Sequence, residues 1–282
     1  MIDTSFLSQL NRFSLVVNKR VTSNYAGSKR SIAVGGGLVF KDYRIYAPGD
    51  DIRAVDWKVY ARTDDLYLKT YEEERNLVVH VIVDHSKSMD FGKKLSKFDF
   101  ASMIGVGFAY LAMKDNEKFQ FSTFSNEISV FRPKRGLSHL GAMVDYLNKV
   151  KPKGESKLFD SIDDYKKFIT SRSMIIILSD FLINIEEIKK TLSRLGKHDI
   201  KVIQVLDPIE KDLDLSGDYK LKDSETNDMM KTYVSRNLKN KYKSMLDDHT
   251  DKISDVCYKL GINFYQFTTD IPIFDAFYDI LK

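Results

Sequence analysis

The chain has 282 residues, 43% of them hydrophobic and 30% charged, a composition typical of a folded protein with one large domain or two smaller ones. Its 44 basic and 40 acidic residues give a net charge of +4 with no long basic block, so we expect no nucleic-acid binding. Cys257 is the single cysteine, which excludes an intramolecular disulfide and a cysteine-based zinc site and fits a reducing cytoplasm.

No targeting or membrane-spanning segment is predicted. The N-terminal sequence has an acid at position 3 and lacks an apolar core followed by a small-residue cleavage site, so it does not read as a secretory signal. The most apolar stretch, residues 98–113, contains Asp99 and is shorter than the roughly 20 residues of a spanning helix. We therefore expect it to be a buried helix that lies close to the sheet through its small residues.

Residues 1–76 predict a small β-rich unit. Short alternating runs such as residues 66–71 and the turn-forming Pro48-Gly49-Asp50 favour strands joined by tight turns. The triplet Gly35-Gly36-Gly37 lacks the spaced glycines, the lysine and the following helix of a phosphate-binding loop, so nucleotide binding is not predicted. The charged residues from Arg44 to Arg62, around Trp57, form either a docking surface or an ion-pair network that ties this unit to the rest of the chain, and we favour the network.

Residues 77–282 predict an α/β domain with a doubly wound, mostly parallel sheet. Short apolar runs alternate with segments whose apolar residues recur at helical spacing, as in sheets covered by helices on both faces. The predicted strands are residues 77–83, 119–124, 174–178, 200–205 and 263–267. The predicted helical core stripes are Leu137, Leu140, Val144 and Leu147, then Leu158, Ile162, Tyr165 and Ile169, then Ile185, Ile188, Leu192 and Leu195.

Two later segments carry weaker signals. The polar, turn-rich residues 207–228 predict an exposed hairpin. Residues 231–243 are basic with interleaved tyrosines, and their apolar spacing favours a solvated helix face over a nucleic-acid-binding patch.

Oxygen-bearing side chains follow the first predicted strand of the α/β domain. Asp84 ends the run LVVHVIVD, and Ser86 and Ser88 come two and four residues later. In open α/β sheets ligands bind in the crevice outside the strand ends, and Asp180 ends a second apolar run in the same way, while Ser156 precedes a predicted helix. Carboxylate and hydroxyl oxygens suit Mg²⁺ or Mn²⁺ better than zinc or copper, so these residues predict a cation site with a position left for a carboxylate from a protein partner.

This set resembles the metal-ion-dependent adhesion site of von Willebrand factor A domains. The resemblance covers roughly residues 77–282 and implies a Rossmann-like fold with Asp84, Ser86, Ser88, Ser156 and Asp180 as metal ligands. Ser156 departs from the threonine usual in that family. The segment from GGGLVF to EEERNL also resembles the motif region of the bacterial and archaeal domain-of-unknown-function 58 family, in which it directly precedes a von Willebrand A-like domain. Members are commonly encoded beside MoxR-type AAA+ ATPases, which implies such an ATPase as partner.

Alternatives to the metal site remain at this stage. Asp84, Ser86 and Ser88 also fit a helix-capping turn, and Asp180 fits a cap for the helix through Ile185. His80 within a strand and His85 within the serine loop have no metal-ligand spacing to another histidine, so core or solvent roles are expected.

The alternatives for function are an enzyme and a purely structural adaptor whose metal loop never exchanges ligands. A phosphohydrolase could use Asp84 as nucleophile, but the general acid expected two residues later is replaced by Ser86, and no Gly-x-Ser-x-Gly turn of a serine hydrolase is present. The sequence therefore favours a metal-dependent protein-interaction module over an enzyme.

Overall fold

In the computed structural model the chain divides into two compact units, residues 15–76 and residues 77–282 together with residues 1–14. The residues described are 2, 5–6, 8–11, 31–34, 39–73, 78–196, 198–213, 215, 217–222 and 229–282. Among these, no helix is long and apolar enough to cross a membrane.

The first residues of the chain belong to the α/β unit, whereas the division expected at residue 76 put them in the N-terminal unit. Ile2, Phe6 and Leu10 are all buried, and the Phe6 and Phe274 rings lie 5.9 Å apart. The backbone of Ile2 donates to Oδ1 of Asn148 and accepts from its Nδ2, each at 3.0 Å. The difference arises because these apolar side chains find their buried contacts on the α/β unit.

The N-terminal unit contains a three-stranded antiparallel sheet in the order β1-β3-β2, which confirms a β-rich region. Its elements are β1 (Ser31–Val34), β2 (Val39–Ile45), the 3-10 turn η1 (Ile52–Ala54), α2 (Trp57–Thr63) and β3 (Tyr67–Glu73). The glycine triplet at 35–37 lies outside the described residues.

Charged side chains of the segment from Arg44 to Arg62 pair within the N-terminal unit. Arg44 pairs with Asp50 at 2.7 Å, and Asp56 pairs with Lys69 at 3.0 Å while it caps α2. Hydrogen bonding from Lys69 lowers the pKa of Asp56 to about 2. These pairs organise the unit itself, and the expected network between the two units stays a prediction.

The α/β unit is built on a six-stranded sheet in the order β11-β8-β7-β4-β5-β6, parallel throughout except for the edge strand β6. All five predicted strands are present. The strands are β4 (Val78–Asp84), β5 (Lys118–Phe124), β6 (Ile128–Val130), β7 (Met174–Ser179), β8 (Asp199–Leu206) and β11 (Asn263–Thr268).

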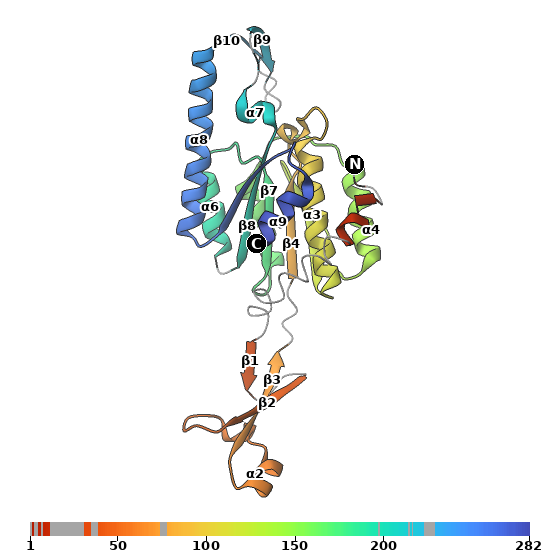
Figure 1. Ribbon diagram of the computed structural model, residues 1–282, viewed down its shortest axis with the longest axis vertical. Helices are drawn as coiled ribbons and strands as arrows, with labels where there is room; N and C mark the ends of the chain where they lie inside the picture. Colours follow the sequence, from red (N-terminus) through yellow and green to blue (C-terminus); the bar gives the residue numbers. More distant parts are fainter. Residues whose placement is uncertain are drawn as a thin grey trace. The chain divides into compact units, whose positions relative to one another are not determined.

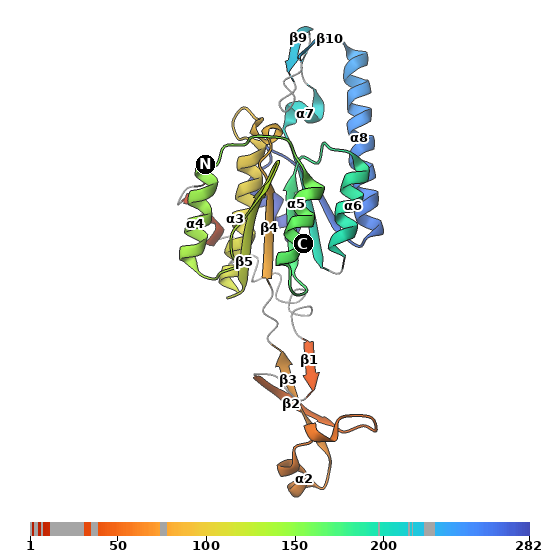
Figure 2. The same cartoon turned by 180° about the vertical axis from the view of Figure 1, so that it is seen from behind.

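Helices cover both faces of this sheet, with α3, α4 and α9 on one side and α5, α6 and α8 on the other (Figure 1 and Figure 2). The second layer buries a cluster that includes Ile82, Ile177, Ile188 and Ile253. The helices are α3 (Lys97–Lys114), α4 (Leu137–Lys149), α5 (Leu158–Tyr165), α6 (Ile185–Leu195), α7 (Pro208–Asp212), α8 (Arg236–Lys259) and α9 (Ile273–Leu281), with 3-10 turns η2 (Lys87–Asp90) and η3 (Lys166–Phe168). A doubly wound α/β architecture is thereby confirmed.

Helix α3 is the buried central helix that the apolar run predicts, and two of its glycines are needed for close packing. A Cβ at Gly105 would lie 2.8 Å from Cγ1 of Val81 on the sheet, and one at Gly107 would lie 1.8 Å from Cζ of Phe277 on α9. The helix therefore approaches the sheet at one glycine and a neighbouring helix at the other.

Some local predictions are refined by the structure. The predicted hairpin forms from β9 (Gly217–Lys222) and β10 (Met229–Val234), and its turn lies outside the described residues. The helix expected over residues 231–243 begins only at Arg236, because Ser235 caps α8 and the residues before it pair in β10. Leu137, predicted to be core, is 67% exposed at the first position of α4, although it lies on the same helix face as the buried Leu140 and Val144.

Candidate metal centre

The candidate site lies where β4 and β7 end. These neighbouring strands are parallel, with Val83 opposite Leu178, so Asp84 at the end of β4 and Asp180 just after β7 reach the same edge of the sheet. Both side chains are buried, at 0% and 2% exposure. This is the edge at which open α/β folds bind ligands.

The Asp84 carboxylate accepts hydrogen bonds from three separate segments of the chain. Its Oδ2 accepts hydrogen bonds from the hydroxyls of Ser156 at 2.8 Å and Ser179 at 2.7 Å. Its Oδ1 accepts from the backbone N–H of Ser86 at 2.8 Å. Ser156, which stands where the von Willebrand A family usually has threonine, is therefore in direct contact with Asp84.

Ser86 and Ser88 present their hydroxyls together, with their Oγ atoms 3.1 Å apart. Ser86 is buried and Ser88 half-buried, so the pair is partly accessible from outside. Ser86 stands at the N-cap position of η2 but makes no capping hydrogen bond with its side chain. The helix-capping alternative therefore does not account for its hydroxyl.

Asp180 bonds to a lysine that the sequence analysis did not single out. Its Oδ2 lies 2.8 Å from Nζ of Lys97, whose side chain is fully buried, and its Oδ1 accepts from the backbone N–H of Leu182. The same ammonium lies 2.7 Å from Oε1 of Glu210. Asp180 does not cap α6, as one alternative suggested. The N-cap of α6 is Asn184, whose side chain accepts a hydrogen bond from the N–H of Glu186.

The electrostatics of the site reflect removal of charges from water. Burial raises the pKa of the Asp84 carboxyl, and the nearby Asp180 charge raises it further, against hydrogen bonds from Ser179 and Ser86. Burial also raises the pKa of Glu210. Burial lowers the pKa of Lys97, but the charges of Asp180 and Glu210 outweigh this and leave it above its ordinary value.

The donor set fits a hard divalent cation. Asp84 and the hydroxyls of Ser86, Ser88 and Ser156 bring together one carboxylate and three neutral oxygens, which are ligands that Mg²⁺ and Mn²⁺ accept. Among the described residues, no group of three or more His, Cys, Asp or Glu side chains is placed to hold a metal. A cation here would depend on serine oxygens more than on carboxylates.

The two histidines near the site have structural surroundings. His80 is buried in β4 with Nδ1 2.7 Å from the Tyr165 hydroxyl, and burial lowers its pKa to about 4. His85 is also buried, and its Nε2 lies 3.3 Å from the Ser125 hydroxyl. These contacts agree with the core roles expected for them.

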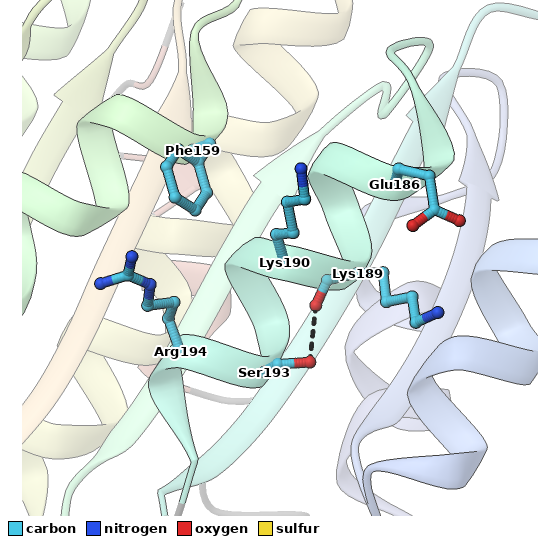
Figure 3. Close-up of a pocket in the computed structure, with 6 residues that line it drawn as sticks. All are labelled: Phe159, Glu186, Lys189, Lys190, Ser193 and Arg194. Atoms are coloured by element: carbon cyan, nitrogen blue, oxygen red, sulfur yellow. Dashed lines mark hydrogen bonds between the residues drawn. The ribbon is translucent and has the colours of Figure 1, made fainter.

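A separate pocket of about 380 Å³ lies along α6, lined by Phe159, Glu186, Lys189, Lys190, Ser193 and Arg194 (Figure 3). Arg194 lies over the Phe159 ring, 5.4 Å from its centroid, and pairs with Asp163 at 2.9 Å. The Ser193 hydroxyl donates to the carbonyl of Lys189, so it is engaged by its own helix and is not paired with a base. The residues that line this pocket do not include Asp84, Ser86, Ser88, Ser156 or Asp180, which together are called the Asp84 cluster below.

The sequence matches the family described as protein of unknown function DUF58 over residues 42–252, more than half of the chain. The chain belongs to this family. This confirms the resemblance read from the N-terminal segment. DUF58 is defined without a function, so membership does not assign one.

Two relatives of this DUF58 protein are described as uncharacterized proteins. Rv1480 of Mycobacterium tuberculosis is 28% identical over 230 residues, which span 79% of this chain and 72% of the relative. YeaD of Bacillus subtilis is 25% identical over 146 residues, spanning 51% of this chain and 35% of the relative.

Solved structures that resemble the chain include von Willebrand A-type proteins. BatB from Bacteroides thetaiotaomicron is 15% identical with a TM-score of 0.46, over 73% of this chain and 95% of that structure. The SpRpn10 VWA domain is 10% identical with a TM-score of 0.45, over 72% of this chain and 94% of that structure. For this DUF58 chain, the doubly wound fold itself rests on the strand order and the helix layers described above.

Proposed function

We propose that this DUF58 protein is a metal-dependent protein-interaction module whose Asp84 cluster holds Mg²⁺ or Mn²⁺ and receives an acidic side chain from a protein partner. The observation that carries the proposal is the convergence of the Ser156 and Ser179 hydroxyls on one oxygen of buried Asp84, with the Ser86 and Ser88 hydroxyls alongside. Its von Willebrand A-like architecture supports an interaction role.

The residues that would hold the cation are Asp84, Ser86, Ser88 and Ser156, with Asp180 as the second carboxylate at the same strand edge. When bound, the cation offers a coordination position that an Asp or Glu carboxylate from outside can take in exchange for water. The chain's own part is to orient the oxygens. Ser179 fixes the Asp84 carboxylate from inside the strand edge, and the Ser86 N–H fixes its second oxygen.

The same geometry argues against catalysis. A phosphohydrolase that used Asp84 as a nucleophile would need an acid at the position of Ser86, and the Asp84 oxygens are already bonded to two hydroxyls and a backbone N–H. Glu210 and Asp180 are both tied to Lys97, which keeps them from acting as a general acid toward a substrate at Asp84. Binding is therefore the better reading of the site.

A MoxR-type AAA+ ATPase, or a client that it remodels, is the partner we propose. The support is the likeness of the N-terminal segment to proteins commonly encoded beside such ATPases, together with DUF58 membership over residues 42–252. The alternative is a structural adaptor whose metal site is permanently filled. For such an adaptor, a chelator would leave the complex with its partner intact.

Association of the purified chain with a MoxR-type ATPase, measured by size-exclusion chromatography, tests the proposal. Replacing Ser86 and Ser88 together by alanine is expected to abolish association in Mg²⁺, as EDTA does for the wild type. The control replaces Ser138 and Ser193, two exposed serines of α4 and α6, and is expected to bind like the wild type. Equal binding by the Ser86/Ser88 variant, in EDTA as in Mg²⁺, would place the contact elsewhere.

A further inference from the structure

Lys97 is a charged side chain with 0% exposure, at the first residue of α3, the buried helix that packs on the centre of the sheet. Lysines are almost never fully buried unless paired, because taking an ammonium out of water costs several kcal/mol. The position adds a further cost, since the N-terminus of a helix carries partial positive charge and disfavours a cation. Strong local compensation is therefore required.

Two carboxylates from distant parts of the chain supply that compensation. Asp180 follows β7 and lies 2.8 Å from Nζ, and Glu210 belongs to α7 and lies 2.7 Å from it. Glu210 is itself held, because its Oε2 accepts from the N–H of Asp207 in the capping box of α7. Lys97 thus has a fixed place rather than a mobile surface position.

Asp180 interacts with both Asp84 and Lys97. Its charge acts on Asp84, while one of its oxygens is occupied by the Lys97 ammonium. A divalent cation beside Asp84 would meet the positive charge of Lys97 across Asp180, and Coulomb repulsion between like charges is strong where water is excluded. The ammonium therefore opposes entry of any metal ion at this strand edge.

We infer that Lys97 is a built-in cation that competes with the metal ion for Asp180 and sets the metal affinity of the Asp84 site. This rests on the proposed function, since it concerns the same cluster. With one ammonium against the carboxylates of Asp84, Asp180 and Glu210, the local formal charge is only two negative. The site is therefore weaker for cations than its carboxylates alone would make it, and a bound divalent ion would leave no excess of negative charge to repel an acidic partner.

Titration calorimetry with Mn²⁺ tests this on the full chain. Lys97→Met combined with Glu210→Gln removes the ammonium and one of its partners together, which avoids leaving two buried carboxylates unpaired. The local formal charge stays at two negative in this variant, but Asp180 no longer has an ammonium partner. We therefore expect the variant to bind Mn²⁺ at least about tenfold more tightly than the wild type, because the cation nearest to Asp180 has been removed. The single variant Lys97→Met keeps the negative charge of Glu210, so its folded form is expected to bind Mn²⁺ more tightly still.

Lys201→Met is the matched control. Lys201 is also buried, but it lies at the opposite end of β8 with its ammonium over the Tyr265 ring, 5.6 Å from the centroid. Its replacement is expected to leave Mn²⁺ affinity within about twofold of the wild type.

The outcomes separate the inference from the proposed function. Equal or weaker Mn²⁺ binding by the Lys97→Met/Glu210→Gln variant, with the wild type binding normally, overturns the inference alone. Binding by that variant when the wild type shows none supports it, because the ammonium then excludes the metal. No binding by any variant overturns both.

Discussion

The hydroxyl of Ser156 lies 2.8 Å from Oδ2 of Asp84, although 72 residues separate them in the chain. Ser156 reaches this place because the loop before α5 passes over the end of β4, where Lys87 N–H donates to the Gly154 carbonyl and Lys153 N–H to the His85 carbonyl, each at 2.8 Å. The serine loop after β4 and the loop before α5 are thus fastened together by backbone hydrogen bonds. A ligand at Asp84 would contact both loops.

Mg²⁺ is expected to raise the melting temperature of the wild type relative to EDTA, because a ligand that binds only the folded state stabilises it by mass action. At about 100 times the dissociation constant this amounts to about 2.7 kcal/mol, or several degrees. Ca²⁺ should stabilise less, since the site offers few carboxylates. Asp84→Ala should show the smallest response, and a wild-type curve unchanged by millimolar Mg²⁺ would argue against an accessible site.

Ser156→Thr is expected to keep the Mg²⁺-dependent rise in melting temperature, because threonine retains the hydroxyl at this half-buried position. Ser156→Ala should lose part of that rise and about 1 kcal/mol of stability in EDTA, since it leaves Asp84 without one donor. Thermal melts of the three proteins with and without Mg²⁺ check this. A full Mg²⁺ response in Ser156→Ala would remove Ser156 from the ligand set.

No phosphatase, esterase or nucleotidase activity is expected, because a serine stands where an acid is needed. Generic phosphoester and ester substrates in Mg²⁺ provide the assay. Turnover that disappears in Asp84→Asn would show instead that Asp84 is a nucleophile.

Acid should destabilise the α/β unit through His80. Burial, with a smaller effect from His198, lowers the pKa of His80 from 6.5 to about 4, so the unfolded chain takes up this proton at higher pH than the folded one. Stability from this group is full above pH 6.5 and falls as the pH drops toward 4, by up to about 3 kcal/mol. Chemical denaturation at several pH values should show a weaker pH dependence for His80→Gln, and parallel curves would rule His80 out.

Glycine substitutions test the packing of α3. Gly107→Ala is expected to cost at least about 1–3 kcal/mol, because the new Cβ would lie 1.8 Å from Cζ of Phe277. Gly141→Ala is the control, since a Cβ at this exposed position of α4 would meet nothing within 4 Å, and it should stabilise by up to about 1 kcal/mol. Similar urea midpoints for both variants would contradict the close contact between α3 and α9.

The centre of the sheet could be predicted because β4 and β7 are nearly continuous apolar runs that are buried on both faces. The edge strand β6 was not predicted, since residues 128–130 are too short to show a period. Asp84, Ser86 and Ser88 could be found because they are close in sequence. Ser156 and Asp180 were found from their places before a helix and after a strand.

Lys97 and Ser179 were missed for a physical reason. The apolar run that predicts helix α3 starts at Phe98, which leaves Lys97 outside it, and the carboxylate partners of Lys97 lie 83 and 113 residues away. Two signals in the sequence could have pointed to this pair. In α/β folds the helices start at the edge where the strands end, which places Lys97 near the site. The run Asp207-Pro208-Ile209-Glu210 has the spacing of a capping box, which fixes the position of Glu210. Ser179 was missed because the carboxylate of the next residue, Asp180, is the stronger metal-ligand signal. The last residue of a strand can also reach the crevice.

Anomalous scattering from Mn²⁺ in crystals of the wild-type chain would show whether the Asp84 cluster holds a metal ion. We predict one peak at the end of β4, roughly 2.0–2.3 Å from oxygens of Ser86, Ser88 and Asp84 or a water that they hold. The same soak of Asp84→Asn crystals should give a much weaker peak. A wild-type map with no peak at Asp84, from crystals soaked in millimolar Mn²⁺, would contradict the proposed metal site.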